Sequence, residues 1–261
     1  MRKNILIITD LEGISGVSTI EEVQPEYKNY QRTLEYLMDD TNAAINGAFL
    51  GGATDVFVVD GHCTGINFIE GALDKRAIQV PASEFSTNPP DKYDALITIG
   101  CHPMAGTTNG FLDHTQSASQ WFEYKVGGKA YGEIGQQAIT LGAYNIPLVM
   151  VSGDLLACKE ARELVPTVAT ATVKTGICRN KAECIPHIEA LKLIENAACD
   201  GVQRMDEIKP YKIQLPTEVK LTLYRSDYCD EICRYSDNII RNGRTVIKTV
   251  TKIEKYRDIL F

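Results

Sequence analysis

Short apolar runs alternate with longer stretches of helical periodicity along most of the chain. An apolar run at residues 4–9 is followed by a loop, a long amphipathic stretch at 30–50, and a second apolar run at 55–59. Apolar positions in the long stretch recur every three or four residues, as on one face of a helix. Gly51 and Gly52 end that stretch. The pattern predicts a β-α-β unit with a right-handed crossover.

Shorter elements continue this alternation. Further strands are expected at 77–80, 95–99, 147–152 and 170–174, and helices at about 133–141, 157–164 and 186–201. The alternating segment 120–126 meets two glycines and then 129–131, which is typical of a β-hairpin. We therefore expect an α/β fold, with a mostly parallel, Rossmann-like sheet flanked by helices.

A change of pattern near residue 205 indicates a second unit. Pro210 and Pro216 interrupt the chain, and beyond them strands are expected at 219–224 and 245–251 around a helix near 227–235. The last residues are expected to be helical. We predict a metal-binding catalytic α/β domain at 1–205 and a smaller C-terminal α/β subdomain at 206–261.

Composition excludes several classes of protein. The 261 residues carry a net charge of −7, and the basic residues are scattered, so nucleic-acid binding is not expected. No apolar stretch approaches the roughly 18 residues that span a bilayer. The apolar run after Met1 is too short for a signal peptide because Asp10 interrupts it. With eight cysteines and no C-x-x-C pair, we expect reduced thiols, no structural zinc knuckle and a cytoplasmic location.

Four polar residues follow predicted strands at their carboxyl ends. Asp10 and Glu12 follow the first strand, His62 follows the second, and His102 follows the strand at 95–99. Carboxyl ends of parallel strands share one edge of a sheet, where open α/β sheets bind ligands. Two close carboxylates repel unless a cation or a proton compensates. Alone, each residue also fits an ordinary loop or a structural histidine; together they indicate a metal-dependent enzyme.

Other candidate residues have more than one interpretation. His114 ends a flexible loop after His102 and fits a ligand, an acid/base group or a surface histidine. Glu133 at a helix start is ordinary, because it complements the helix dipole. Asp154 fits a helix cap or a carboxylate outside the ligand set, His187 fits a structural role, and Asp60 could accept the other ring N–H of His62. Walker A, Rossmann G-x-G-x-x-G and G-x-S-x-G motifs are absent from the sequence.

Several of these segments occur together in one known family. Asp-Leu-Glu-Gly-Ile-Ser-Gly at 10–16, Asp-Gly-His at 60–62, Gly-Cys-His at 100–102, His114 and Gly-Glu-Ile-Gly at 132–135 resemble the DppA-type D-aminopeptidases, the M55 family of zinc peptidases. The segments at 149–154 and 159–161 extend the resemblance, which covers roughly 4–180. The sequence departs from the family pattern at Ile8 and Asp113, which puts the substrate range in question rather than hydrolysis.

The resemblance implies a dinuclear zinc centre, with two Zn²⁺ ions per chain. The ligands it implies are Asp10, Glu12, His62, His102 and Glu133, and the catalytic residue is His114. Five protein ligands exceed what one catalytic zinc takes, so two ions sharing a carboxylate, naturally Asp10, would use them.

The resemblance also implies an activity and an assembly. The expected enzyme is a zinc-dependent aminopeptidase that releases N-terminal D-amino acids from short peptides through a metal-activated water. A homo-oligomer, a decamer in the family, is expected too. The alternatives are a metal-dependent amide or ester hydrolase of other specificity and a non-catalytic peptide-binding protein of the same fold.

Overall fold

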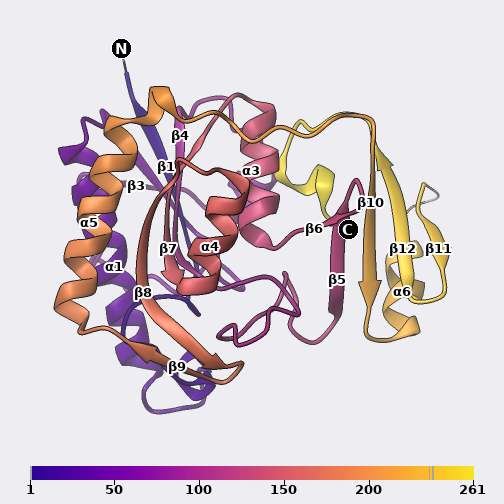
Figure 1. Cartoon of the computed structure of the whole chain (residues 1–261), viewed down its shortest axis with the longest axis horizontal. Helices are drawn as coiled ribbons and strands as arrows, with labels where there is room; N and C mark the ends of the chain where they lie inside the picture. Colours follow the sequence, from indigo (N-terminus) through magenta and orange to yellow (C-terminus); the bar gives the residue numbers. More distant parts are fainter. Residues whose placement is uncertain (1, 235, 237) are drawn as a thin grey trace.

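A seven-stranded sheet forms the centre of the larger part of the molecule (Figure 1). The computed structural model describes residues 2–234, 236 and 238–261. The strand order is β3-β2-β1-β4-β7-β8-β9, and every neighbouring pair is parallel except β8 with β9. The strands are β1 (Asn4–Thr9), β2 (Asp55–Asp60), β3 (Ile78–Gln79), β4 (Ala95–Cys101), β7 (Leu148–Asp154), β8 (Ala169–Cys178) and β9 (Lys181–Cys184). The central strands β4 and β7 are buried along their whole length, as expected of a parallel sheet covered on both faces.

Helices cover the two faces of this sheet. α1 (Tyr30–Leu50) packs against α5 (His187–Gln203) on one face, and α3 (Glu133–Ala143) packs against α4 (Leu155–Leu164) on the other (Figure 1). The short helix α2 (Ala82–Thr87) contacts β2. The alternation of strand and helix, each with one apolar face, therefore yields the expected mostly parallel α/β architecture.

A second, antiparallel sheet lies beside the first (Figure 1). Its order is β11-β12-β10-β5-β6, with β5 (Trp121–Val126), β6 (Lys129–Ala130), β10 (Thr217–Leu223), β11 (Ile240–Asn242) and β12 (Thr245–Val250). α6 (Ser226–Cys233) packs on it, and the 3₁₀ segments are η1 (Ile20–Val23), η2 (Met205–Glu207) and η3 (Tyr256–Ile259). Residues after 205 thus share a sheet with the 121–130 hairpin. The domain boundary near 205 stays a prediction.

The predicted strands and helices occur close to their expected positions. The β5–β6 turn is the two-glycine turn, with φ of 57° at Gly127 and 85° at Gly128. Three short elements were not predicted, because their six, four and three residues carry too little periodicity to detect: α2, β9 and β11. The predicted last residue of the helix near 227–235, Tyr235, lies outside the described residues.

Two observations bear on the predicted environment of the chain. Within the described residues, none of the helices has the length and apolar character needed to cross a membrane. All eight cysteines are free thiols. The cytoplasmic location stays a prediction.

A buried hydrogen bond helps to tie the end of the chain to the second sheet. The hydroxyl of Tyr124, on β5, donates to the backbone carbonyl of Ile259 in η3 at 2.7 Å, and both residues are buried. Leaving a buried carbonyl without its donor costs more than the net value of an ordinary hydrogen bond.

We expect Tyr124→Phe to lower the free energy of unfolding by about 1–2 kcal/mol, because it orphans that buried carbonyl. Chemical denaturation measures the change. Tyr27→Phe is the control, since the Tyr27 side chain is exposed. If the two variants have equal free energies of unfolding, the hydrogen bond from Tyr124 to Ile259 does not stabilise the fold as expected.

Candidate metal centre

The predicted residues meet at the point where the strand order reverses. β1 lies between β2 and β4, so the chain leaves β1 in one direction and later returns on the other side. Ligands of open α/β sheets bind in the crevice that opens at such a point. Asp10 follows β1, His62 follows β2 and His102 follows β4, each at the carboxyl end of its strand.

Asp10, Glu12 and His62 form one group at this edge. Nδ1 of His62 lies 3.0 Å from Oδ1 of Asp10 and 3.1 Å from Oε2 of Glu12. Their ligating atoms all lie within 4.8 Å of one another. The carboxylates of Asp10 and Glu12 therefore converge on one histidine, with residues 11–16 in turns and bends.

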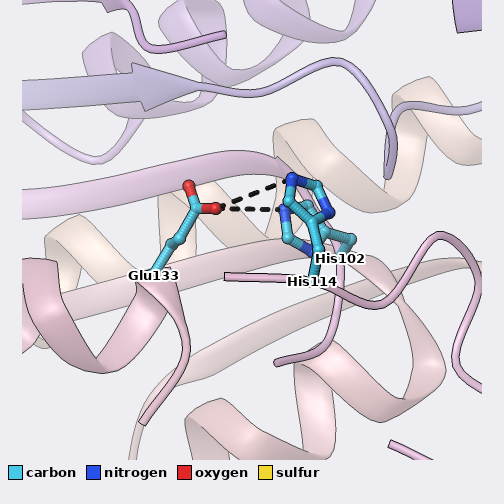
Figure 2. A group of neighbouring side chains, drawn as sticks. All are labelled: His102, His114 and Glu133. Atoms are coloured by element: carbon cyan, nitrogen blue, oxygen red, sulfur yellow. Dashed lines mark ion pairs between the residues drawn. The ribbon is translucent and has the colours of Figure 1, made fainter. Parts of the chain in front are cut away.

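His102, His114 and Glu133 form a second group (Figure 2). Oε1 of Glu133 lies 3.5 Å from Nε2 of His102 and 3.9 Å from Nε2 of His114, and the two imidazole rings stack with centroids 3.9 Å apart. Nδ1 of each histidine faces a backbone carbonyl, that of Pro103 at 3.1 Å and that of Leu112 at 2.8 Å. A carbonyl only accepts, so Nδ1 of each ring carries a proton, and Nε2, which faces Glu133, is the nitrogen that can bind a metal ion or, without one, carry a second proton.

Asp10 connects the two groups. Its Oδ1 faces His62, and its Oδ2 lies 3.3 Å from Nε2 of His102. One carboxylate therefore presents one oxygen to each group. This is the arrangement that a carboxylate shared between two cations requires.

The charges at the site are strongly coupled. Burial raises the pKa of the Glu12 and Glu133 carboxyls, but the neighbouring histidines outweigh it and lower both pKa values. Burial lowers the pKa of His62, yet Glu12 and Asp10 raise it overall to about 12. The pKa of His102 is likewise raised by Asp10 and Glu133 against the effect of burial. The carboxylates therefore stabilise positive charge, whether it comes as a proton or as a metal ion.

These residues fit a metal. Oε2 of Glu12 is buried and, although Nδ1 of His62 lies 3.1 Å away, it accepts no well-aligned hydrogen bond from the described residues, which is costly for a carboxylate oxygen in a protein interior. Three carboxylates and three imidazoles are a donor set that Zn²⁺ and similar divalent ions bind.

A pocket of about 680 Å³ lies over the two groups. Asp10, Glu12, His62, His114 and Glu133 line it together with Ile8 from β1. Further walls come from segments that the sequence analysis did not connect with the site. These walls are Phe85 of α2, Gln116 of the loop before β5, and Tyr256, Arg257 and Leu260 at the end of the chain.

Asp60 differs from its predicted role. Its carboxylate accepts the backbone N–H of His62 at 3.3 Å and the backbone and side-chain N–H groups of Asn67, so it orders the loop rather than the imidazole ring. The expected contact with the ring N–H was wrong. Asn67, within the same loop, supplies the N–H donors that Asp60 accepts instead.

Two other candidates have structural roles. Asp154 caps α4 by accepting the N–H of Leu156 at 2.6 Å and also accepts that of Gly176 at 2.9 Å. His187 starts α5 and contacts Ser15 and Asp39 through its two ring nitrogens. Neither residue joins the two groups.

Asp113, a departure from the family pattern, closes the loop between His102 and His114. Its Oδ2 accepts the N–H of Gly106 at 2.7 Å. The half-buried carboxylate of Glu160, on α4, accepts the N–H of Met104 at 3.0 Å in the same loop. This loop is therefore fixed at both ends by carboxylates, and His114 is held beside His102.

The chain is similar to known proteins over nearly its whole length. The sequence profile of the Peptidase M55 family, described as D-aminopeptidase, matches residues 3–260. A D-aminopeptidase of Bacillus subtilis (strain 168) is 32% identical over 205 residues, 77% of this chain and 74% of the relative. A solved structure described as the zinc-dependent D-aminopeptidase DppA from Bacillus subtilis, a self-compartmentalizing protease, superposes with a TM-score of 0.91. It is 26% identical, and the match covers 98% of this chain and 95% of that one.

We expect a divalent cation to stabilise the folded chain, by about 2.7 kcal/mol at one hundred times its Kd, because it neutralises the crowded carboxylates. Thermal unfolding with added Zn²⁺ and with chelator measures this. Glu12→Gln should lose part of the difference, because it removes a ligand from one of the two groups and leaves the other intact. Glu163→Gln, an exposed carboxylate on α4, should keep it. If the wild-type chain unfolds at the same temperature with added Zn²⁺ and with chelator, the expectation is refuted.

Proposed function

We propose, on the premise that this chain belongs to the M55 family of D-aminopeptidases, that it is a zinc-dependent aminopeptidase that releases N-terminal D-amino acids from short peptides. The observation that carries the proposal is the convergence of two ligand groups on the floor of one pocket. The likeness to a zinc-dependent D-aminopeptidase over nearly the whole chain supports it.

Two zinc ions per chain are proposed. Asp10, Glu12 and His62 would hold one, and Asp10, His102 and Glu133 the other, so that Asp10 bridges them. Each ion would then have three protein ligands and an open position, as catalytic zinc does. The chemistry that bound zinc supplies is a water of lowered pKa and a polarised scissile carbonyl.

His114 is proposed as the proton-transfer residue. Its Nε2 faces the pocket side of Glu133 at 3.9 Å, further away than His102, and its side chain is more exposed than that of His102. The carbonyl of Leu112 keeps its proton on Nδ1. Nε2 can therefore take a proton from the attacking water and pass it to the leaving amine.

The walls of the pocket fit a short substrate. Apolar atoms of Ile8, Phe85 and Leu260 lie over the polar floor, and Arg257 is the only lysine or arginine among the lining residues. A short peptide presents a side chain to such walls and its N-terminal amine to the carboxylates. If several copies of this protein enclose the site, long polypeptide substrates are excluded from it.

A homo-oligomer is also proposed, and the family resemblance implies a decamer. A cytoplasmic location is proposed as well, as expected from the sequence. The description of the DppA structure as a self-compartmentalizing protease supports assembly. Sedimentation velocity at micromolar concentration should show a particle of closed symmetry, several times the 28.9 kDa of one chain. A stable monomer would contradict the proposal.

The stereochemical preference is tested with matched anilides. We expect kcat/KM for D-Ala-p-nitroanilide to exceed that for the L-isomer by at least about tenfold, because a shaped pocket next to fixed metals accepts one hand of the Cα substituent. Chelator should abolish both activities. Equal rates on the two isomers would favour an amide hydrolase of other specificity, and no turnover of either would favour a binding protein.

Two histidine variants separate metal binding from proton transfer. His62→Ala should lose zinc and activity together, since it removes a ligand. His114→Ala should keep two zinc ions and lose about 10²–10⁴-fold in kcat, as for a lost acid/base group. Elemental analysis and steady-state kinetics on the same preparations measure both. If His114→Ala loses zinc as fully as His62→Ala, His114 is a ligand instead.

A further inference from the structure

A buried lysine lies directly behind the loop that carries two of the proposed ligands. We call residues 10–17 the ligand loop. Lys174, on β8, is 1% exposed. Its Nζ donates to the backbone carbonyl of Glu12 at 2.8 Å and to that of Val17 at 2.6 Å. Two backbone carbonyls of the ligand loop therefore accept hydrogen bonds from one ammonium group.

This lysine has no carboxylate in direct contact among the described residues. Its hydrogen bonds go to backbone carbonyls, and its Nζ lies 4.8 Å from the centre of the Phe111 ring. Burial lowers the pKa of Lys174 to about 8. Burying a charge without an opposite charge in contact costs stability, so packing alone does not account for a lysine at this position.

The ligand loop is held at a second point by a buried acid. Asp40, on α1, accepts the backbone N–H of Ser15 at 2.7 Å through Oδ2 and its hydroxyl at 2.5 Å through Oδ1. Asp40 and Ser15 are both fully buried. A cation and an anion from distant segments of the chain, β8 and α1, therefore fix neighbouring turns of one loop, and neither belongs to the two ligand groups.

The backbone of Glu12 cannot move independently of these contacts. Gly13 donates its N–H to the carbonyl of Gly100 at 2.8 Å, and a Cβ at Gly13 would lie 2.1 Å from the carbonyl oxygen of Cys101. The loop is thus pressed against β4 on one side and held by Lys174 on the other. The side chain of Glu12 is left to point into the pocket, where its Oε2 lies 3.1 Å from Nδ1 of His62.

We propose that Lys174 is a positioning residue of the metal centre: with Asp40, it holds the ligand loop so that the Glu12 carboxylate stays aimed at the ion bound by Asp10, Glu12 and His62. The inference rests on the proposed function, because it presupposes a metal at that group. Groups that orient metal ligands commonly account for about 10–100-fold in metal affinity.

Lys174→Met tests the proposal, because methionine keeps most of the volume and removes both hydrogen bonds. Zinc alone is the probe, titrated against a chromogenic chelator well below the unfolding temperature. We expect one of the two zinc ions to be weakened by about 10–100-fold and the other to be unchanged. Lys159→Met is the control, since the Lys159 side chain on α4 is 66% exposed, and it should bind zinc as the wild type does.

The outcomes separate positioning from simple structural support. A folded Lys174→Met that unfolds at a lower temperature without metal, yet binds both ions with wild-type affinity, would overturn the proposal. Equal weakening of both ions would overturn it as well. If Lys174→Met does not fold, Ser15→Ala decides by the same criterion, because it removes the hydroxyl contacts of the same loop with Asp40 and His187 and removes no buried charge. Its expected effect is a several-fold weakening of the same ion, and unchanged affinity would overturn the proposal.

The wild-type titration keeps this test apart from that of the function. A wild-type chain that binds no zinc refutes the proposed function, and the inference falls with it. A wild-type chain that binds two ions, beside a variant that also binds two equally well, refutes only the role of Lys174.

Discussion

Three carboxylates that point at one another across a largely buried sheet edge are the constraint on which this structure depends. Asp10, Glu12 and Glu133 cannot all remain ionised there without positive charge between them. Three histidines lie among them, and their nitrogens face the carboxylate oxygens at 3.0–3.9 Å. The fold supplies the place, because the reversal of strand order beside β1 opens a crevice at the carboxyl ends of three strands.

Much of the surrounding structure keeps these charges in place. Backbone carbonyls fix the tautomers of His102 and His114, and a carboxylate from α4 fixes the loop between them. Buried charges behind the ligand loop fix the backbone of Glu12. Such supporting contacts hold a site in a single geometry, which catalysis at a metal pair requires. Several charged side chains are therefore buried around the centre. Burying them lowers the stability of the fold, so stability alone does not explain their presence.

The sequence predicted the strand-end residues because a local rule applies to them. Asp10, His62 and His102 each follow an apolar run, and parallel strands bring such positions to one edge. Glu133 and His114 follow no such rule, since a glutamate at a helix start and a histidine in a loop are ordinary. Only the resemblance to a family identified them. Their proximity to His102 depends on how α3 and the loop after β4 pack, which no short pattern encodes.

Other parts of the site depend on contacts between distant segments and could not be predicted. Lys174 lies more than 150 residues from the carbonyls that it binds. The pocket wall from Tyr256 and Arg257 comes from the last turn of the chain, which Tyr124 anchors to the second sheet. The short helix α2, which contributes Phe85, was missed altogether, because six residues show too little periodicity.

The most direct test of the account is X-ray diffraction from crystals of the zinc-loaded protein, with data collected on both sides of the zinc absorption edge. The account predicts two anomalous peaks per chain on either side of the Asp10 carboxylate, at the roughly 3.5–4 Å separation of two-metal sites. One peak should contact Glu12 and His62, and the other His102 and Glu133. A single peak, or two peaks that do not share Asp10, would contradict it.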